Sequence, residues 1–185
     1  MVNYESVFIH PTAMVEDEVT IGEGTKIWAF THVRSGARIG KNCVIGERVY
    51  VDSGVVIGDN CKIQNLAQLY RRLTLENGVF VGPGVMFAND LLPRAINLDG
   101  SLKSDSDWEV LETRVGIGAA IGMGSIVGPG RKIGEYALIG MGSLVTRDVE
   151  AYNLVFGNPA KFQGYRCKCG ENVERLIRDC SHRKK

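Results

Sequence analysis

Residues 37–63 read ARIGKNCVIGERVYVDSGVVIGDNCKI, and in this stretch an aliphatic residue returns at every sixth position. A period of six fits neither the 3.6-residue turn of an α-helix nor the two-residue alternation of a lone strand. It fits a short strand followed by a tight turn. The first run of such positions is Ile9, Val15, Ile21, Ile27, Val33, Ile39, Ile45, Val51, Ile57, Ile63, Leu69, Leu75, Val81 and Phe87, and the second is Val115, Ile121, Val127, Ile133, Ile139 and Val145.

Glycine accounts for 23 of the 185 residues, which is well above the usual ~7%. Many glycines directly follow the aliphatic residue of the repeat, as at Gly22, Gly40, Gly46, Gly58 and Gly82. Turn residues need unusual backbone angles, which glycine adopts at little cost. Three consecutive repeats, each a strand and a turn, close one triangular coil, and successive coils stack through parallel backbone hydrogen bonds. The repeat therefore predicts an all-β chain, a parallel β-helix.

Charge and composition exclude several classes of protein. Lys and Arg number 22 and Asp and Glu 21, so the formal net charge is +1, without the basic excess of a nucleic-acid binder. A hydrophobic fraction of 44% excludes a disordered chain. We expect no membrane span because no apolar run is long enough. The N-terminus has no basic stretch followed by an apolar run, so we expect a cytoplasmic protein without a signal peptide.

The repeat divides the chain into two parts. We expect the β-helix over 1–156 and a separate C-terminal segment over 157–185. The phase of the repeat changes across 88–114, which predicts one long inserted loop. Loops of this length in a compact domain are usually functional or disordered. A plain surface excursion is the alternative.

The C-terminal segment carries two weaker signals. Val173, Leu176 and Ile177 have helical spacing, which predicts a short helix near 171–179 that covers the end of the solenoid.

Cysteines cluster in the same segment. Cys167, Cys169, Cys180 and His182 are potential zinc ligands, but Cys-x-Cys spacing is weaker than the usual two to four intervening residues. Free thiols are the favoured interpretation, so we expect no metal ion, with a zinc site as the alternative.

Several motifs narrow the fold to a family. The stretches IGEYALIGMGSLVTRDV (133–149) and GNPA (157–160) resemble the C-terminal end of hexapeptide-repeat acyl-coenzyme A transferases, whose fold is a left-handed parallel β-helix. The stretches IHPTA (9–13), KIQN (62–65) and FANDLLPRA (87–95) resemble the nucleotide-linked amino-sugar N-acetyltransferases of that family. Among these, the type that acts on UDP-2-acetamido-3-amino-2,3-dideoxyglucuronate is the most similar.

The resemblance implies an activity. A sugar amine attacks the thioester of acetyl-coenzyme A, the cosubstrate, in the biosynthesis of surface polysaccharides such as lipopolysaccharide. The implied assembly is a homotrimer with its sites between subunits, and the implied partner is a nucleotide sugar.

Many relatives use a histidine base, whereas the amino-sugar subfamily orients the amine with an asparagine at the start of the long loop. Asn89 matches that position, and Asp90 is the second catalytic candidate. Turn formation at a loop start is the alternative for both.

Substrate candidates follow from the motifs and from the length of the coil, which is three repeats. Arg71 lies one coil before Asn89 and His32 lies at an outward position, where a surface or interface role is favoured over that of a base. Relatives often carry a carboxylate at the position of Arg71, so a more anionic sugar such as a uronate is one hypothesis. The full set of substrate-binding candidates is His32, Gln64, Asn65, Tyr70, Arg71 and Arg94.

Coenzyme candidates lie in the later coils. The resemblance places the coenzyme along their outer edge, with Gly122 and Gly140 at coil corners, Pro159 in the GNPA motif, and Arg147 and Lys161 as phosphate contacts.

Two alternatives to this interpretation remain open, and the sequence disfavours a third. A γ-class carbonic anhydrase shares the fold but needs a His-x4-His pair, which the sequence lacks. An O-acetyltransferase of the same fold and a non-catalytic β-helix scaffold stay open. The scaffold gains support because relatives often have His and Asn where this chain has Ala29 and Leu66.

Overall fold

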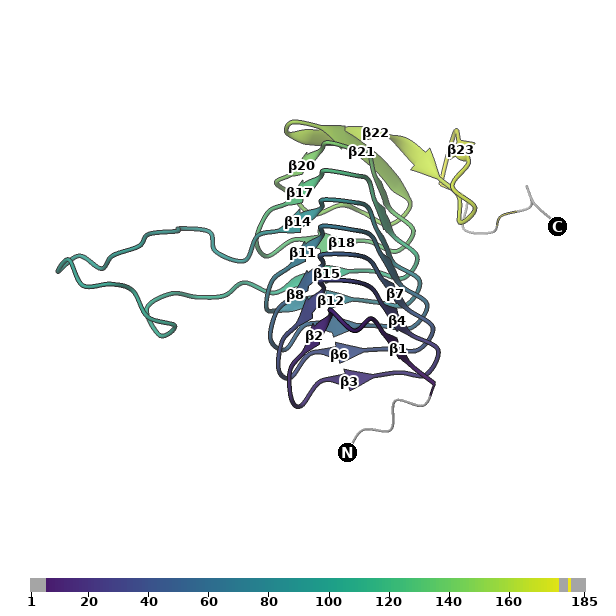
Figure 1. The fold of residues 1–185 in the computed structure, drawn as a ribbon. Helices are drawn as coiled ribbons and strands as arrows, with labels where there is room; N and C mark the ends of the chain where they lie inside the picture. Colours follow the sequence, from purple (N-terminus) through teal and green to yellow (C-terminus); the bar gives the residue numbers. More distant parts are fainter. Residues whose placement is uncertain (1–5, 177–179, 181–185) are drawn as a thin grey trace.

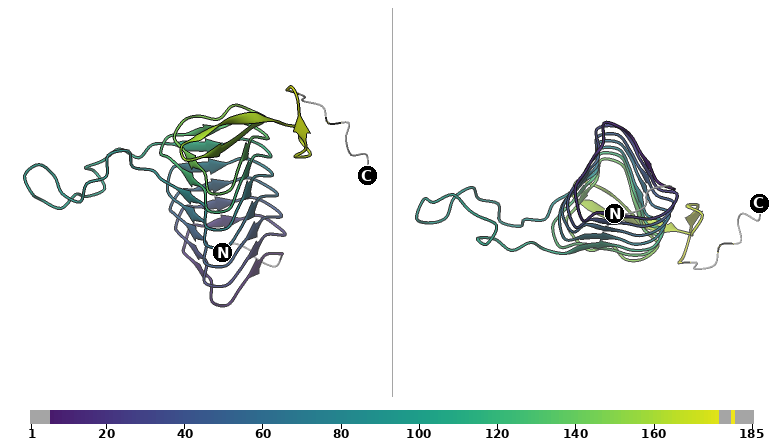
Figure 2. Two further views of the ribbon diagram at one scale, coloured as in Figure 1. Left: turned by 90° about the horizontal axis from the view of Figure 1, so that it is seen from above. Right: turned by 60° about the horizontal axis from the view of Figure 1, so that its bottom comes forward.

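Three sheets form the faces of a triangular prism in a computed structural model that describes residues 6–176 and Cys180 (Figures 1 and 2). The first sheet contains β1 (Phe8–Ile9), β4 (Lys26–Ile27), β7 (Val44–Ile45), β10 (Lys62–Ile63), β13 (Phe80–Val81), β16 (Ala120–Ile121), β19 (Leu138–Ile139), β21 (Asn153–Gly157), β22 (Ala160–Arg166) and β23 (Asn172–Val173). The second contains β2 (Met14–Val15), β5 (His32–Val33), β8 (Tyr50–Val51), β11 (Gln68–Leu69), β14 (Met86–Phe87), β17 (Ile126–Val127) and β20 (Leu144–Val145). The third contains β3 (Thr20–Ile21), β6 (Arg38–Ile39), β9 (Val56–Ile57), β12 (Leu73–Leu75), β15 (Thr113–Val115) and β18 (Lys132–Ile133).

The strands stack at the predicted period. Ile63 pairs with Ile45, which lies one coil earlier in the sequence, and Leu69 pairs with Val51 in the same way. Every position of the repeat named above falls in a strand of this stack. The predicted all-β fold, a left-handed parallel β-helix, is confirmed.

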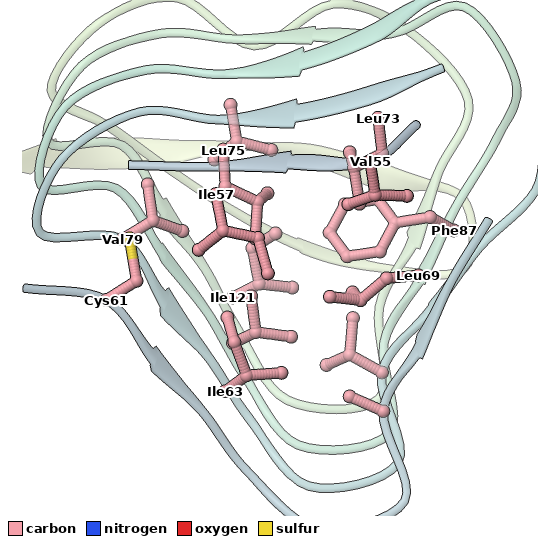
Figure 3. Close-up of a cluster of buried hydrophobic side chains, with 14 of the residues drawn as sticks. Val55, Ile57, Cys61, Ile63, Leu69, Leu73, Leu75, Val79, Phe87 and Ile121 are labelled. Atoms are coloured by element: carbon pink, nitrogen blue, oxygen red, sulfur yellow. The ribbon is translucent and has the colours of Figure 1, made fainter. Parts of the chain in front are cut away.

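The prism is filled by the aliphatic residues of the repeat. Ile63 and Leu69 are fully buried and point into the interior from two faces, with Ile57 on the third (Figure 3). Phe87 is the largest fully buried side chain. Each such residue contributes roughly 1.5–3 kcal/mol on burial, so the stack of inward residues supplies the core.

Asparagine and aspartate side chains link neighbouring coils at the corners. The Oδ1 atom of Asn65 accepts a hydrogen bond from the backbone N–H of Glu47 at 2.9 Å, and Asp59 and Asn77 make the same link to Lys41 and Asp59. Because a corner turn leaves N–H groups without strand partners, these links satisfy them.

The long insertion leaves the prism between the second and third sheets. Strand β14 ends at Phe87 and β15 begins at Thr113, and the intervening segment 88–112 projects far to one side (Figures 1 and 2). Thr113 pairs with Leu73 of the preceding coil, so the stack resumes in register after the insertion. We call this edge of the prism, where 88–112 departs, the loop corner.

The C-terminal segment covers one end of the stack with strands. β21 adds a parallel rung to β19 and then forms an antiparallel hairpin with β22. The helix predicted near 171–179 is wrong for the described part of that range: β23 pairs with Tyr165 and Arg166 of β22, and a bend follows. The open edge of β22 has backbone groups that need hydrogen-bond partners. Residues 172–173 provide them as a strand, which stabilises this segment more than the weak helical spacing would stabilise a helix. Residues 177–179 lie outside the described residues.

Across the described residues, we find no helix that is both long and apolar enough to cross a membrane.

Candidate active site

Asn89 and Asp90 begin the long loop, and the structure gives them different partners. The backbone carbonyl of Asn89 accepts from the N–H of Leu111 at 3.2 Å, which closes the base of the loop. Its half-buried side-chain amide has no hydrogen-bond partner within the described part of the chain. Oδ1 of Asp90 accepts from the N–H of Leu92 at 2.8 Å and forms a turn. Asn89 is therefore free to bind a ligand, while Asp90 shapes the loop.

Arg71 joins the preceding coil to the loop. Its guanidinium donates to both carboxylate oxygens of Asp105, at 3.0 and 3.4 Å, and lies over the ring of Trp108 at 4.9 Å. This hydrogen bonding by Arg71 lowers the pKa of Asp105. The bidentate pair and the stacked ring together fix where the loop returns to the prism.

Asp52 anchors the same corner one coil earlier. It is only 7% exposed and accepts from the backbone N–H groups of Ser53 (2.8 Å) and Arg71 (3.2 Å). The Tyr50 hydroxyl also donates to it at 3.2 Å. Burial raises the pKa of Tyr50. Asp52 thus holds the backbone that presents Arg71.

His32 belongs to a second set of charges further down the corner. Its Nε2 lies 2.7 Å from Oε1 of Glu16, and Arg34 links Glu16 (3.6 Å) to Asp52 (3.4 Å). A backbone hydrogen bond from Ser35, followed by that from His32, lowers the pKa of Glu16. His32 is therefore held by a carboxylate within the scaffold.

The outer face of the second sheet carries no charged carboxylate, lysine or arginine side chain along the strands that the structure describes. Its outward residues are Met14, His32, Tyr50, Gln68, Met86, Ile126 and Leu144. Met14 is 60% exposed and Met86 43%. The outward position predicted for His32 is confirmed, because His32 pairs with Met14 and Tyr50 in the neighbouring strands of this face. Apolar or neutral side chains therefore line this face along the stack, apart from the His32 imidazole, which pairs with Glu16.

The predicted substrate residues divide between two corners. Tyr70 and Arg71 lie at the loop corner, and the Tyr70 ring packs 5.7 Å from that of Tyr50. Gln64 and Asn65 lie at the other edge of the second sheet, where a depression of about 290 Å³ also contains Trp28. Strand β11 separates the two groups within one chain.

Arg94 lies in the exposed part of the loop, where its guanidinium donates to the carbonyl of Pro93 at 2.8 Å. It contacts neither group of predicted substrate residues through any bond in the described structure.

Three of the predicted coenzyme residues lie together. Arg147, Pro159 and Lys161 line a cavity of about 370 Å³ between the last coil and the β21–β22 hairpin. Gly122 and Gly140 lie elsewhere, at the corner shared by the first and second sheets. A Cβ at Gly122 would lie 2.5 Å from the backbone nitrogen of Met141, and one at Gly140 2.6 Å from the Cβ of Phe156. Their backbone N–H groups donate to the next coil, so both glycines serve close stacking.

Several residues of the loop corner were not predicted from the sequence. Glu16, Arg34 and Asp52 follow one another at intervals of one coil and alternate in sign, so the coil period contained the signal for this column. Asp105 carried no such signal, because its contact with Arg71 depends on the path of an irregular loop.

Comparison with known proteins places the chain in a family. A family model for the bacterial transferase hexapeptide (six repeats) matches residues 18–53 and 36–71. The chain is 38% identical over 170 residues to the dTDP-3-amino-3,6-dideoxy-alpha-D-galactopyranose 3-N-acetyltransferase of Aneurinibacillus thermoaerophilus, covering 92% of this chain and 84% of the relative. The chain belongs to the hexapeptide-repeat acyltransferase family.

Solved acetyltransferase structures and their relatives in fold superimpose on this chain. The acetyltransferase domain of PglB from Neisseria gonorrhoeae superimposes with a TM-score of 0.53 at 22% identity, and WeeI from Acinetobacter baumannii with 0.51 at 27%. The matches cover 85% and 83% of this chain, which spans 57% and 56% of those solved chains. The PglB match, at 22% identity, is evidence for a shared fold and for nothing further.

Replacing Asp105 with Asn tests the anchoring of the loop. Loss of the Arg71 pair should raise amide hydrogen exchange in 103–108 several-fold at neutral pH. Because its pKa is lowered in the folded chain, Asp105 contributes to anchoring above its unfolded pKa and loses this contribution as the pH falls through its folded pKa. Wild-type exchange should therefore approach that of D105N in acid. Asp99→Asn is the control, since among the residues that the structure describes Asp99 bonds to Ser101, within the loop itself. Equal exchange in D105N and D99N would contradict the anchoring role.

Proposed function

We propose that the chain is an acetyl-coenzyme A-dependent N-acetyltransferase that acts on the amino group of a nucleotide-linked amino sugar. The unpartnered side-chain amide of Asn89 at the loop corner, seen within the described part of the chain, is the observation that carries this proposal. The activity printed for the Aneurinibacillus relative, an amino-sugar N-acetyltransferase, supports it. The proposed setting is the cytoplasm, where the product would enter surface polysaccharide biosynthesis.

Positioning by Asn89 is the core of the proposed mechanism. Its amide oxygen accepts a hydrogen bond from the neutral sugar amine and directs the nitrogen lone pair at the thioester carbon. The C–N bond forms, the tetrahedral intermediate collapses, and the C–S bond breaks. The departing thiolate takes the proton that the amine loses, so the step needs no separate base.

His32 is too remote to act as that base at Asn89. Strands β5 and β14 are three steps apart in the second sheet, and neighbouring strands lie ~4.8 Å apart, which gives a separation of about 14 Å. A general base must come within hydrogen-bond reach of the proton, directly or through one water. We therefore assign His32 to the scaffold, where it pairs with Glu16.

Acetyl-coenzyme A would lie along the loop corner. Arg147 follows β20, two strands beyond β14 in the second sheet, which places it about 10 Å along the same edge from Asn89. Gly128, Pro129 and Gly130 occupy that edge between them, and because the Leu111 side chain lies against Gly130, the pantetheine arm would run beside Gly128 and Pro129. Arg147 and Lys161 then offer positive charge to the phosphates.

Arg71 has a role in holding the loop rather than in selecting an anionic sugar. The Asp105 carboxylate forms an ion pair with the Arg71 guanidinium, and the Trp108 ring stacks against the same guanidinium. This removes the reason for preferring a uronate, and we propose a neutral amino sugar as the substrate.

We further propose a homotrimer with the outer face of the second sheet turned toward the threefold axis. In such an assembly each chain's loop corner meets the other edge of the second sheet in its neighbour. That arrangement brings the two separated groups, Asn89 with Tyr70 and Gln64 with Asn65, to one intersubunit site. Met86 and Ile126, which are exposed in one chain, become buried.

Free thiol release from acetyl-coenzyme A tests the activity. We expect turnover with dTDP-3-amino-3,6-dideoxygalactose, and none when its amine is replaced by a hydroxyl. Asn89→Ala should lower kcat about 10²-fold, the scale of a lost positioning contact. Asn97→Ala is the control, because Asn97 bonds Ser101 within the loop. Turnover with the hydroxyl sugar alone would establish an O-acetyltransferase, and absence of both turnover and coenzyme binding a scaffold.

Ile126→Glu tests the assembly. A carboxylate on the face turned to the axis would bring three like charges together in a desolvated contact, so we expect the mass from light scattering to fall from trimer to monomer. Lys132→Glu on the third sheet is the control, since Lys132 is exposed on a face that the proposed trimer leaves to solvent. A wild-type chain that is monomeric at assay concentrations would contradict the proposed site between subunits.

A further inference from the structure

Three cysteines that the acetyl transfer does not use converge at the far side of the molecule. Cys167 and Cys169 lie in the turn between β22 and β23, which is closed by hydrogen bonds from Cys167 N–H to the carbonyl of Glu171 (3.1 Å) and from Gly170 N–H to that of Cys167 (2.9 Å). Cys180 lies beyond β23 in the sequence. All three Sγ atoms lie within 4.8 Å of one another.

We propose that Cys167, Cys169 and Cys180 bind a structural zinc ion. Soft thiolates select Zn²⁺ among the common divalent ions. A tetrahedral site with Zn–S bonds of ~2.3 Å sets its sulfurs roughly 3.8 Å apart. Cys167 and Cys180 have Sγ atoms 3.6 Å apart, which already matches. The Cys167–Cys169 separation of 2.7 Å opens to this value by a side-chain rotation of Cys169.

The surroundings fit a structural ion. Cys167 is only 2% exposed, so its thiol is shielded from solvent. Structural zinc sites supply folding free energy where a segment has little core of its own. The ion would join the chain around Cys180 to the β22–β23 turn. The described residues supply three ligands, and His182, the fourth potential zinc ligand in the sequence, lies outside those residues.

The site is separate from the proposed active site. The β22–β23 turn and the 88–112 loop project from opposite sides of the prism (Figures 1 and 2). The turn contacts the prism through Lys168, whose Nζ lies 5.2 Å from the centroid of the Tyr136 ring, and Tyr136 stacks on Tyr152. The zinc would thus stabilise the C-terminal segment on the prism without taking part in acetyl transfer.

Metal content of the full-length chain tests the proposal. The chain is purified under reducing conditions, saturated with Zn²⁺ and freed of excess metal, and its zinc is measured by elemental mass spectrometry. We expect about one ion per chain, the content of a single structural site, and a loss of most of it in Cys169→Ser and Cys180→Ser. Cys61→Ala is the matched control and should keep its zinc, because Cys61 is buried in the β-helix, in a column that also contains Ala119 and Ala137.

Absorption of the Co²⁺-substituted chain and its circular dichroism distinguish loss of a metal ligand from loss of the fold. Substitution with Co²⁺ should give the charge-transfer absorption of thiolate-bound metal in the wild type and not in C180S, with the β-sheet circular dichroism unchanged in both. Wild type without metal, cysteine variants that keep full zinc, or a Cys167–Cys169 disulfide in the purified chain would each overturn the proposal. None of these readouts depends on acetyl transfer, so they stand apart from the test of the proposed function.

Discussion

Parallel stacking of coils of one fixed length is the constraint on which the rest of this structure depends. Each coil hydrogen-bonds to the next through its backbone, as in the pairing of Ile63 with Ile45, and one aliphatic residue per strand fills the interior. A side chain in the stack therefore has neighbours one coil before and one coil after it on the same face or corner. Residues that are one coil apart in the sequence therefore form a column in space, and both the interior and the functional surface are built from such columns.

The loop corner shows how a column becomes a site. Asp52 holds the backbone of Arg71, Arg71 holds Asp105, and Asn89 lies near the start of the loop that carries Asp105. The stack resumes in register at Thr113, so the insertion leaves the core unchanged. A rigid prism thus presents one amide with free hydrogen-bonding capacity among the described residues of this corner, which is what catalysis by positioning requires.

The sequence predicted the strands because their period is set by the core, and it predicted that Asn89 and Arg71 share a corner because the coil length is fixed. It failed where no period applies. The helix near 171–179 was wrong because the open edge of β22 recruits β23. The link from Arg71 to Asp105 depends on an irregular loop, and the separation of Gln64 from Asn89 on opposite edges of the second sheet needed the closed triangle rather than the spacing alone.

The most direct test of the account is a crystal structure of the chain with coenzyme A and the amino sugar nucleotide bound. The account predicts the sugar amine against the side-chain amide of Asn89, the coenzyme phosphates near Arg147 and Lys161, and the depression beside Gln64 of a neighbouring chain completing the site. Both ligands bound within a single chain, away from the loop corner, would contradict it.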